Sequence, residues 1–343
     1  MRSLVSILIP AFNAEKWLRD TILSALDQTW EPKEIIIVDD GSTDRTLQIA
    51  RQFQSDSVRV VTQKNQGASA ARNKASSLSR GDYIQWLDAD DLMAPDKIAR
   101  QMEMLMQTGS RRTLASCAFG TFMYRPHRAR FTPTALWHDL SPAEFLMRKL
   151  ETRRFMVNSA WLVSRELTDA AGPWDVRLHY DDDGEYFCRV LLASDGIRFL
   201  SEARVYYRSV GPTSVSYIGT SNTKLDSLWL SMQLHMQSLR SLEDSQRTRA
   251  SCVRYLQNYL IDFYPRRLDI VEKMDQTARN LGGQLERPRL SWKYAWMKAF
   301  LGWGWTKRAQ LVWRKVKWSL IRYWDRVLFH LENRRATGVH DWR

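Results

Sequence analysis

Short apolar runs alternate with helical apolar spacing along the first hundred residues. Runs rich in Ile, Val and Leu predict buried strands at residues 4–9, 35–38, 58–62 and 83–87. Between these runs, apolar residues recur every three or four positions, which predicts helices at residues 15–26, 43–53 and 68–77. This alternation is typical of a parallel sheet covered on both faces. We therefore expect an α/β domain whose ligand site lies at the carboxyl ends of the strands.

The rest of the chain has a different pattern. The middle of the sequence mixes strand and helix signals, at residues 114–123, 141–150, 184–194 and 203–207. Beyond residue 217, strand signals disappear and long helical stretches follow. We expect one α/β domain over residues 1–216, in which residues 1–110 and 111–216 form two parts, and a helical extension over residues 217–343.

Composition changes this picture mainly at the C-terminal end. The 343 residues are 44% hydrophobic and 26% charged, which is ordinary for a globular protein. The formal net charge is +13, and residues 287–343 carry +11 of it, with 14 Lys and Arg against 3 acidic residues. The same segment holds 8 of the 15 tryptophans. Three scattered cysteines argue against a disulfide scaffold and favour a reducing compartment. We expect neither a signal peptide nor a membrane-spanning helix.

Two acidic clusters directly follow predicted strands. Asp40 lies in the sequence DDGSTD, where it either belongs to a capped turn or accepts hydrogen bonds from a nucleobase or ribose. Asp88, Asp90 and Asp91 follow the fourth predicted strand. Three carboxylates so close raise one another's pKa values unless a cation is present. Mg²⁺ or Mn²⁺ suits such oxygen ligands, and a solvated acidic turn is the alternative.

Two further motifs have chemistry that suits the same edge of the sheet. Arg72 lies in NQGASAARN, where it either reaches a phosphate or is an ordinary surface arginine. Asp182 and Asp183 lie in YDDDGE, just before a helical signal. They either stabilise the helix N-terminus or keep a carboxylate that removes a proton from a sugar hydroxyl.

Taken together, these motifs resemble glycosyltransferases of family 2, which have the GT-A fold. The strings VSILIPAFNAEKWL, EIIIVDDGSTD, NQGASAARN and YIQWLDADD resemble the nucleotide-sugar-binding part of that family. The string GPWDVRLHYDDDGEYFCR resembles its acceptor segment. The resemblance covers about residues 1–216. It implies a Rossmann-like, mostly parallel sheet with helices on both faces, to which the α-helical C-terminal extension is added.

The resemblance implies roles in donor binding for several residues. Pro10, Phe12 and Glu15 match positions that line the nucleotide pocket. Asp40 matches the position that holds the base, and Arg72 matches a position beside the nucleotide. Asp88 and Asp90 match the D-x-D motif that binds the nucleotide and a divalent cation, Mg²⁺ or Mn²⁺. Asp90 is expected to contact the metal more directly, and Asp91 is a second possible contact.

The acceptor segment implies the catalytic base. In the family, an acidic pair precedes a further acid, and an arginine follows four residues after that acid. Counting back from Arg189 places Glu185 on the last acid and the base on Asp183. Because three aspartates are consecutive, a shift of one residue leaves Asp182 as the alternative.

The implied activity is metal-dependent, inverting transfer of a sugar from a UDP-linked donor. The acceptor would be a hydroxyl of a glycan or a lipid-linked molecule in cell-surface polysaccharide synthesis. The Q-x-x-R-W motif and membrane helices of processive synthases are missing, which implies single additions. One alternative is a non-catalytic sugar-nucleotide-binding or scaffold protein. Another is a phosphatase that uses D-x-D, although such enzymes carry this motif near the start of the domain.

The basic, Trp-rich segment predicts contact with a membrane surface. Residues 308–331 have the spacing of an amphipathic helix whose apolar arc includes Leu320 and Trp324. Its opposite, cationic face consists of Arg308, Arg314, Lys315, Arg322 and Arg326. Such helices bind anionic headgroups, so we expect a cytoplasmic protein, peripheral on the inner face of the cytoplasmic membrane. The alternative is that the arc packs on the α/β domain. No nucleic-acid-binding module is recognised, and nucleic acid is not an expected partner.

Overall fold

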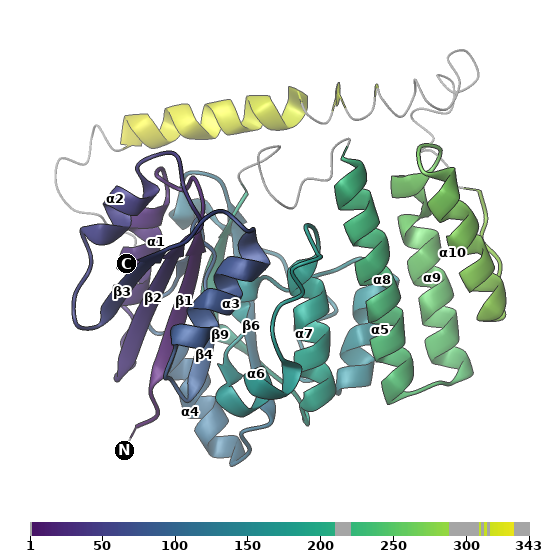
Figure 1. Cartoon of the computed structure of the whole chain (residues 1–343), viewed down its shortest axis with the longest axis horizontal. Helices are drawn as coiled ribbons and strands as arrows, with labels where there is room; N and C mark the ends of the chain where they lie inside the picture. Colours follow the sequence, from purple (N-terminus) through teal and green to yellow (C-terminus); the bar gives the residue numbers. More distant parts are fainter. Residues whose placement is uncertain (1, 210–220, 288–308, 310–311, 314–315, 333–343) are drawn as a thin grey trace.

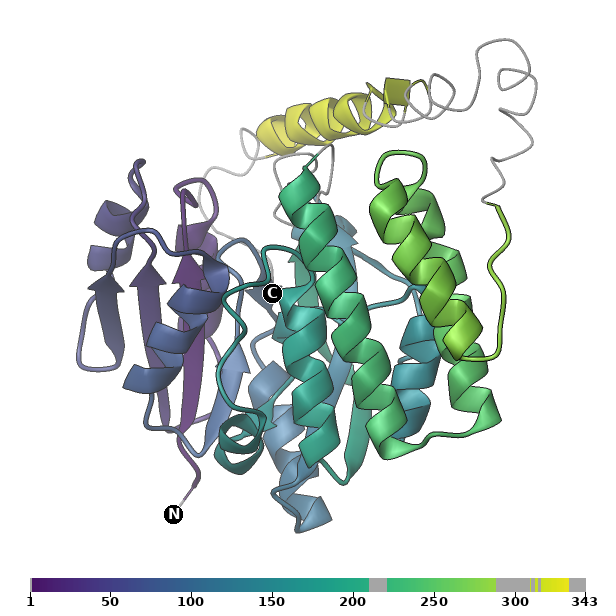
Figure 2. The same ribbon diagram turned by 45° about the vertical axis from the view of Figure 1, so that its right-hand side comes forward.

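The computed structural model describes residues 2–209, 221–287, 309, 312–313 and 316–332 (Figure 1). These residues form two β-sheets with helices packed around them. The helices of the second half of the chain stand beside the α/β part (Figure 2). The expected α/β class with a C-terminal helical region is therefore confirmed.

The first sheet has five strands in the order β3-β2-β1-β4-β8. The strands are β1 Val5–Ala11, β2 Lys33–Asp39, β3 Val58–Thr62, β4 Tyr83–Trp86 and β8 Val163–Ser164. The first four are parallel, as the sequence predicts, and β8 is antiparallel to β4. Nearly every residue of β1 and β2 is buried. Both faces of these strands are covered, which explains why they are continuous apolar runs without alternation.

Three helices connect the parallel strands. They are α1 Leu18–Leu26, α2 Thr46–Arg51 and α3 Ala68–Leu78. Both α1 and α2 begin three residues later than the sequence predicts, because turn residues precede their first helical turn. Helix α3 packs on β1 and β2. It begins after Gly67, whose φ of 93° lies in the left-handed region that favours glycine.

A second sheet has the strand order β5-β9-β6-β7. Its strands are β5 Leu92–Met93, β6 Thr113–Phe122, β7 Arg130–Phe131 and β9 Gly196–Arg208. Strands β6 and β9 are parallel, with a register shift between Cys117 and Ala118. Helix α4, Lys97–Thr108, packs on both of them. The sequence predicts strands in these regions but does not predict that they form a separate sheet.

The remaining helices build the side of the molecule next to this second sheet. They are α5 Pro142–Thr152, α6 Arg165–Ala171, α7 Asp182–Ala193, α8 Asn222–Leu242, α9 Gln246–Phe263 and α10 Leu268–Asn280, with short 3₁₀ turns at Pro126–Arg128 and Asn158–Ala160. Helix α8 packs on α5 and α7, and α9 packs on α5. The helical extension therefore shares a core with the α/β part. The three cysteines are buried and form no disulfide.

Residues 316–332 form a helix that lies along one side of the molecule (yellow in Figure 1). The carboxylate of Asp325 accepts hydrogen bonds from Arg125 Nε and from the backbone N–H of Tyr124, both at 2.9 Å. Glu332 accepts a 2.8 Å hydrogen bond from Arg125 Nη1. The ring of Phe329 lies 6.1 Å from that of Tyr124. The helix thus docks through its acidic residues, one aromatic ring and Arg322, whose Nε donates to the hydroxyl of Tyr124 at 3.4 Å.

The apolar arc of this helix points away from the α/β domain. Leu320 is 57% exposed and Trp324 is 61% exposed. The alternative in which the arc packs on the domain is therefore wrong for these residues. No helix among the described residues is long and apolar enough to span a bilayer. Several residues of the basic, Trp-rich segment lie outside the described residues, namely Trp292, Trp296, Trp303, Trp305, Arg308, Arg314 and Lys315.

Candidate active site

Asp40 joins two loops at the carboxyl edge of the first sheet. Its carboxylate accepts hydrogen bonds from Gln63 Nε2 (2.8 Å) and from the backbone N–H groups of Gln66 (3.0 Å) and Gly67 (2.8 Å). Asp40 is buried, so these bonds fix the loop that leads into α3. The other loop needs Gly41, because a Cβ there would lie 2.8 Å from the backbone nitrogen of Asn65. Asp40 thus binds the loop before α3 and does not cap its own turn, and it lies at the edge of the sheet where a ligand is expected.

The loop after β1 lies against the loop after β2. The backbone N–H of Asn13 donates to Ser42 Oγ at 3.0 Å, and Asn13 Oδ1 accepts from the backbone N–H of Thr43 at 2.9 Å. Of the three residues expected here, Pro10 is half-buried on β1, and Phe12 exposes 49% of its surface. Glu15 accepts hydrogen bonds from the backbone and the guanidinium of Arg45.

Arg72 connects the two acidic motifs of the site. Its Nη2 donates to Asp88 Oδ1 at 2.9 Å, and its Nη1 donates to Asp182 Oδ2 at 2.7 Å. The guanidinium is buried and lies 4.4 Å from the ring centroid of Trp174. Burial alone would lower the pKa of Arg72, but the charges of Asp182 and Asp88 outweigh it and raise the pKa. Arg72 is therefore neither a surface arginine nor a group held open toward solvent.

Two residues of the acidic cluster after β4 have raised proton affinity. Burial, and then the charge of Asp88, raise the pKa of Asp90 to about 7, although the charge of Arg208 opposes this. Burial and the charges of Asp90 and Asp88 also raise the pKa of Asp91. The Asp91 carboxylate accepts hydrogen bonds from Ser159 Oγ at 3.2 Å and from the backbone N–H of Arg208 at 2.9 Å. Asp91 thus has a structural role. Asp90 is only half-buried and lies beside Asp88.

Arg208, at the end of β9, closes the same region. Its guanidinium lies between the rings of Trp17 and Phe122, 4.2 and 4.5 Å from their centroids. Its Nε donates to the backbone oxygen of Asp90 at 2.8 Å, and its Nη1 donates to the backbone oxygen of Met123 at 3.0 Å. This buried cation therefore fixes the backbone of the acidic loop.

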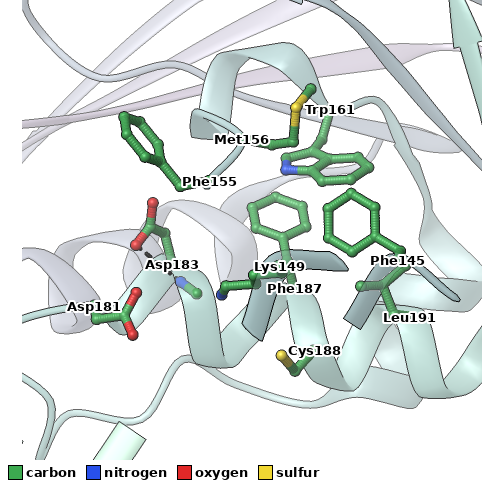
Figure 3. Close-up of a pocket in the computed structure, with 11 residues that line it drawn as sticks. Phe145, Lys149, Phe155, Met156, Trp161, Asp181, Asp183, Phe187, Cys188 and Leu191 are labelled. Carbon is green, nitrogen blue, oxygen red and sulfur yellow. Dashed lines mark hydrogen bonds between the residues drawn. The ribbon is translucent and has the colours of Figure 1, made fainter. Parts of the chain in front are cut away.

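Asp183 lies at the first turn of α7 and lines a pocket (Figure 3). Its Oδ1 accepts a 2.8 Å hydrogen bond from the backbone N–H of Gly184. Burial, and then the charges of Asp182 and Asp181, raise the pKa of Asp183 to about 7, against the charges of Lys149 and Arg72. The pocket wall is mostly apolar and includes Phe145, Phe155, Met156, Trp161, Phe187 and Leu191.

Glu185, the last acid of the motif, has a different role. Both of its carboxylate oxygens accept hydrogen bonds from the guanidinium of Arg189, at 2.7 and 2.8 Å. Its side chain is buried and shares one face of α7 with Arg189, four residues later. This closed ion pair leaves Asp182 and Asp183 as the acids that face the other motifs.

The structure brings the acidic motifs together through α3. Asp40 binds the loop that begins this helix, and Arg72 on the helix binds both Asp88 and Asp182. Sequence reasoning assigned no role to four neutral and basic groups around these acids: Asn158, Trp174, Lys149 and Arg208. Asn158 Nδ2, for example, lies 3.3 Å from both carboxylate oxygens of Asp88. Asn158 lies on a 3₁₀ turn beside β4, and no sequence pattern predicts this position.

Carboxylates alone do not complete a metal-binding cluster here. Within the described ranges, no group of three or more His, Cys, Asp or Glu side chains is arranged to hold a metal ion. Magnesium commonly needs only one or two carboxylates when substrate phosphates supply the other oxygens. The raised pKa of Asp90 is the condition that a nearby cation relieves. Asp88 and Asp90 therefore fit a cation that arrives with a diphosphate.

Comparison with known proteins agrees with this geometry. Residues 6–170 match the model of the family Glycosyl transferase family 2. Among solved structures, the Staphylococcus aureus protein TarS (residues 1–349) has a TM-score of 0.61 over 81% of this chain and 79% of that chain, at 17% identity. The same protein in complex with UDP-GlcNAc has a TM-score of 0.58, covering 81% of this chain and 87% of that chain, at 18% identity. The fold is that of GT-A glycosyltransferases, and residues 6–170 form a family 2 glycosyltransferase domain.

Curated relatives are similar to only part of this chain. An uncharacterised glycosyltransferase of Haemophilus influenzae is 40% identical over 119 residues, which are 34% of this chain and 48% of that protein. The Bacillus subtilis glycosyltransferase TuaG, named for teichuronic acid biosynthesis, is 40% identical over 121 residues, 34% of this chain and 45% of that protein. The chain thus spans less than half the length of each. Chondroitin synthase of Escherichia coli is 46% identical over 97 residues, 28% of this chain and 14% of that protein.

Proposed function

We propose that this protein transfers a sugar from a UDP-linked donor to a hydroxyl of a glycan or lipid-linked acceptor, with inversion at the anomeric carbon. The observation that carries the proposal is the bridge formed by Arg72 between Asp88 of the D-x-D motif and Asp182 of the acceptor motif. A donor diphosphate at the first motif and a base at the second would then be neighbours. Orientation of this kind is a major source of enzymatic rate.

The donor half of the proposal rests on the loops at the strand ends. Exposed Phe12 and the turn at Asp40 suit a nucleotide base and ribose, as the family resemblance implies. A structural neighbour, TarS, has been solved with UDP and with UDP-GlcNAc. This supports a UDP-sugar as donor here. The similarity to TuaG and chondroitin synthase supports cell-surface polysaccharide synthesis as the setting.

Asp90, with Asp88 beside it, would hold a divalent cation, Mg²⁺ or Mn²⁺, when the donor is bound. Such a cation neutralises charge on a departing nucleoside diphosphate. Because Asp91 is fully buried and its oxygens are engaged by Ser159 and Arg208, whereas the Asp88 side chain is 30% exposed, we propose no metal contact for Asp91. Arg208 holds the backbone of this loop and so fixes the direction in which Asp90 points.

Asp183 is the proposed general base. It lines the pocket next to Asp182, and its pKa of about 7 suits a group that takes up a proton near neutral pH. In this account the carboxylate removes the proton of the acceptor hydroxyl, whose oxygen attacks the anomeric carbon opposite the leaving diphosphate. Asp182, bound to Arg72 and Ser69, orients the turn and is not the base.

We also propose that the protein works on the inner face of the cytoplasmic membrane. The helix at residues 316–332 is fixed to the domain by Asp325 and exposes apolar side chains such as Leu320 and Trp324. Lys317 and Arg326 are exposed on the same helix. An apolar face with flanking cations suits the headgroup region of an anionic bilayer. This surface would bring a lipid-linked acceptor to the enzyme.

A panel of UDP-sugars with and without Mn²⁺ tests the function. We expect one UDP-sugar to raise the melting temperature more than UDP alone, as preferential binding to the native state requires. With the same UDP-sugar as donor, the protein should release UDP when a membrane extract supplies acceptors. Binding without UDP release would favour the non-catalytic alternative. Release of inorganic phosphate from phosphate esters, without UDP-sugar binding, would favour the phosphatase.

A further inference from the structure

Helix α8 carries a polar stripe inside an otherwise apolar interface. Ser227, Ser231 and His235 are spaced four residues apart and therefore lie on one face of the helix. All three are buried, and this face packs on α5 and α7. Buried polar side chains in such an interface need partners. Their partners are the turn before α7 and a lysine of α5.

The two serines hold the turn that begins α7. Ser227 Oγ accepts hydrogen bonds from the backbone N–H groups of His179 (3.0 Å) and Tyr180 (2.9 Å), and its hydroxyl lies 2.9 Å from the oxygen of Tyr180. Ser231 Oγ donates to Asp181 Oδ2 at 2.8 Å. Asp181 has a φ of 58°, in the left-handed region that non-glycine residues rarely adopt. Helix α8 therefore fixes an unusual backbone conformation two residues before Asp183.

His235 ends the stripe and holds Lys149. Its Nε2 lies 3.5 Å from Lys149 Nζ, and its Nδ1 lies 2.9 Å from the hydroxyl of Tyr255 on α9. An ammonium group only donates, so Nε2 accepts and Nδ1–H is left to donate to Tyr255. Burial, and then the charge of Lys149, lower the pKa of His235 to about 3. The imidazole is therefore neutral and acts as an acceptor for Lys149.

Lys149 lies among the acids at the start of α7 (Figure 3). A Cβ built on Gly184 would be 2.7 Å from Lys149 Nζ and 2.2 Å from Asp181 Oδ1. The glycine thus leaves the space into which both charged groups fit. Burial lowers the pKa of Lys149, but the nearby acids, Asp181 foremost, outweigh burial and raise it. Lys149 therefore remains charged at neutral pH.

We propose that Lys149 is a positioning residue for Asp183: held by His235, which Tyr255 in turn fixes, it places a positive charge in the pocket that both residues line and so favours the ionised form of the Asp183 carboxylate. The catalytic part of this inference rests on the proposed function. The electrostatic part, the effect of the Lys149 charge on Asp183, does not rest on the proposed function, because it concerns only charged groups of this chain. It also gives the helical extension a role in catalysis, since α8 and α9 supply the groups that hold Lys149.

Several charged or titratable groups surround this pair. Apart from the pair itself, the groups that act on Asp183 or Lys149 come from α3, from α7 and the residue before it, from α8 and from α9. They are Arg72, Asp181, Asp182, Cys188, His235 and Tyr259. Lys149 and Arg72 are the two cations that favour ionised Asp183. Arg72 is already bridged to Asp88 and Asp182, so Lys149 is the cation whose removal isolates the effect on Asp183.

A double-mutant cycle with Lys149→Gln and Asp183→Asn tests the electrostatic part. Glutamine can still donate to His235 but carries no charge. At pH 8, where Asp183 is ionised, the melting temperatures of the four proteins should show favourable coupling between the two positions. At pH 5, where Asp183 is protonated, the coupling should disappear. Equal coupling at both pH values, or none at pH 8, would overturn the proposal.

UDP release measured against pH tests the catalytic part. Lys149→Gln should move the acidic limb of the rate upward by about one pH unit, because an opposite charge nearby lowers a carboxyl pKa by about 1–3 units. Lys149→Arg should restore the position of the limb, and Lys74→Met, at an exposed lysine, should not move it. A uniform loss of rate at all pH values would mean that Lys149 has only a structural role. Coupling in the cycle without any UDP release would instead refute the proposed function alone.

Discussion

Arg72 donates a 2.7 Å hydrogen bond to Asp182, although the two residues are 110 positions apart in the sequence. This bond fastens the first turn of α7 to α3, which packs on the first sheet. The other arm of the same guanidinium holds Asp88. A single buried cation therefore sets the distance between the donor motif and the acceptor motif.

Replacing Arg72 should destabilise the fold as well as the site. Arg72→Met leaves Asp88 and Asp182 without their shared partner, and breaking a buried ion pair in this way costs about 3–5 kcal/mol. Urea unfolding at pH 8 measures this loss. Arg51→Met, at an exposed arginine of α2, is the matched control and should leave stability nearly unchanged. Equal stability of the Arg72 variant and the control would show that the bridge does not hold the site together.

Asp183→Asn should abolish transfer and leave UDP affinity nearly intact. The amide cannot accept the proton of the acceptor hydroxyl, whereas Asp183 does not belong to the donor motifs. UDP release with an acceptor extract and calorimetric titration of UDP measure the two quantities. Asp56→Asn, at an exposed position, is the control. Full activity of Asp183→Asn would remove Asp183 from the role of base, and Asp182→Asn would then be the variant to examine.

The rate of transfer should depend on pH with an acidic limb near pH 7. The pKa of Asp183 is raised to about 7, and only its ionised form can act as a base. Below that pH the rate should fall about tenfold per pH unit, as the ionised fraction falls. A pH series of UDP release under subsaturating donor measures the limb. A rate that stays constant from pH 5 to pH 8 contradicts the assignment.

The same raised pKa has a consequence for stability. The folded protein binds the proton of Asp183 more tightly than the unfolded chain, whose ordinary value is 3.8. The resulting stabilisation is complete below that value and is lost as the pH rises toward 7. Asp183→Asn removes this loss, so the variant should melt at a higher temperature than the native protein at pH 8. The difference should shrink between pH 7 and pH 4, and a difference that grows toward pH 4 would have the wrong sign.

The outward face of the C-terminal helix should bind anionic vesicles. Leu320→Ser and Trp324→Ser each remove apolar surface from that face, and each should weaken binding to phosphatidylglycerol-containing vesicles about tenfold or more. Leu268→Ser is the matched control, because Leu268 is 58% exposed on α10, away from this helix. Co-sedimentation measures the bound fraction. Binding that is the same for all variants, or the same for phosphatidylcholine vesicles, argues against this surface.

Local patterns predicted four of the five strands of the first sheet, and β1, β2 and β4 form clear apolar runs because nearly all of their residues are buried. The β3 strand has the predicted bounds, and β1, β2 and β4 differ by a residue or two at their ends. The acids of the site could also be found, because Asp88 and Asp90 stand out directly after an apolar strand. Their positions in the sequence suggest ligands for a metal or a nucleotide, but they do not indicate which side chains form hydrogen bonds with them.

The supporting groups could not be predicted, because their partners are distant in sequence. Ser231 contacts Asp181 from 50 positions away, and Lys149 meets His235 from 86 positions away. Spacing of four residues in α8 was visible in the sequence, but it also fits an ordinary helix face. The docking of the C-terminal helix through Asp325 likewise depends on Arg125, 200 positions earlier. The spacing of apolar residues predicted the C-terminal helix but did not indicate which face of it contacts the α/β domain.

A crystal structure with a UDP-sugar and Mn²⁺ tests the central claim most directly. We predict density for the uracil and ribose along the loops near Phe12 and Asp40, for the diphosphate and metal beside Asp90, and for the sugar toward Asp183. A nucleotide bound elsewhere, or a sugar directed away from the α7 turn, would contradict the claim that these loops and that turn form one catalytic site.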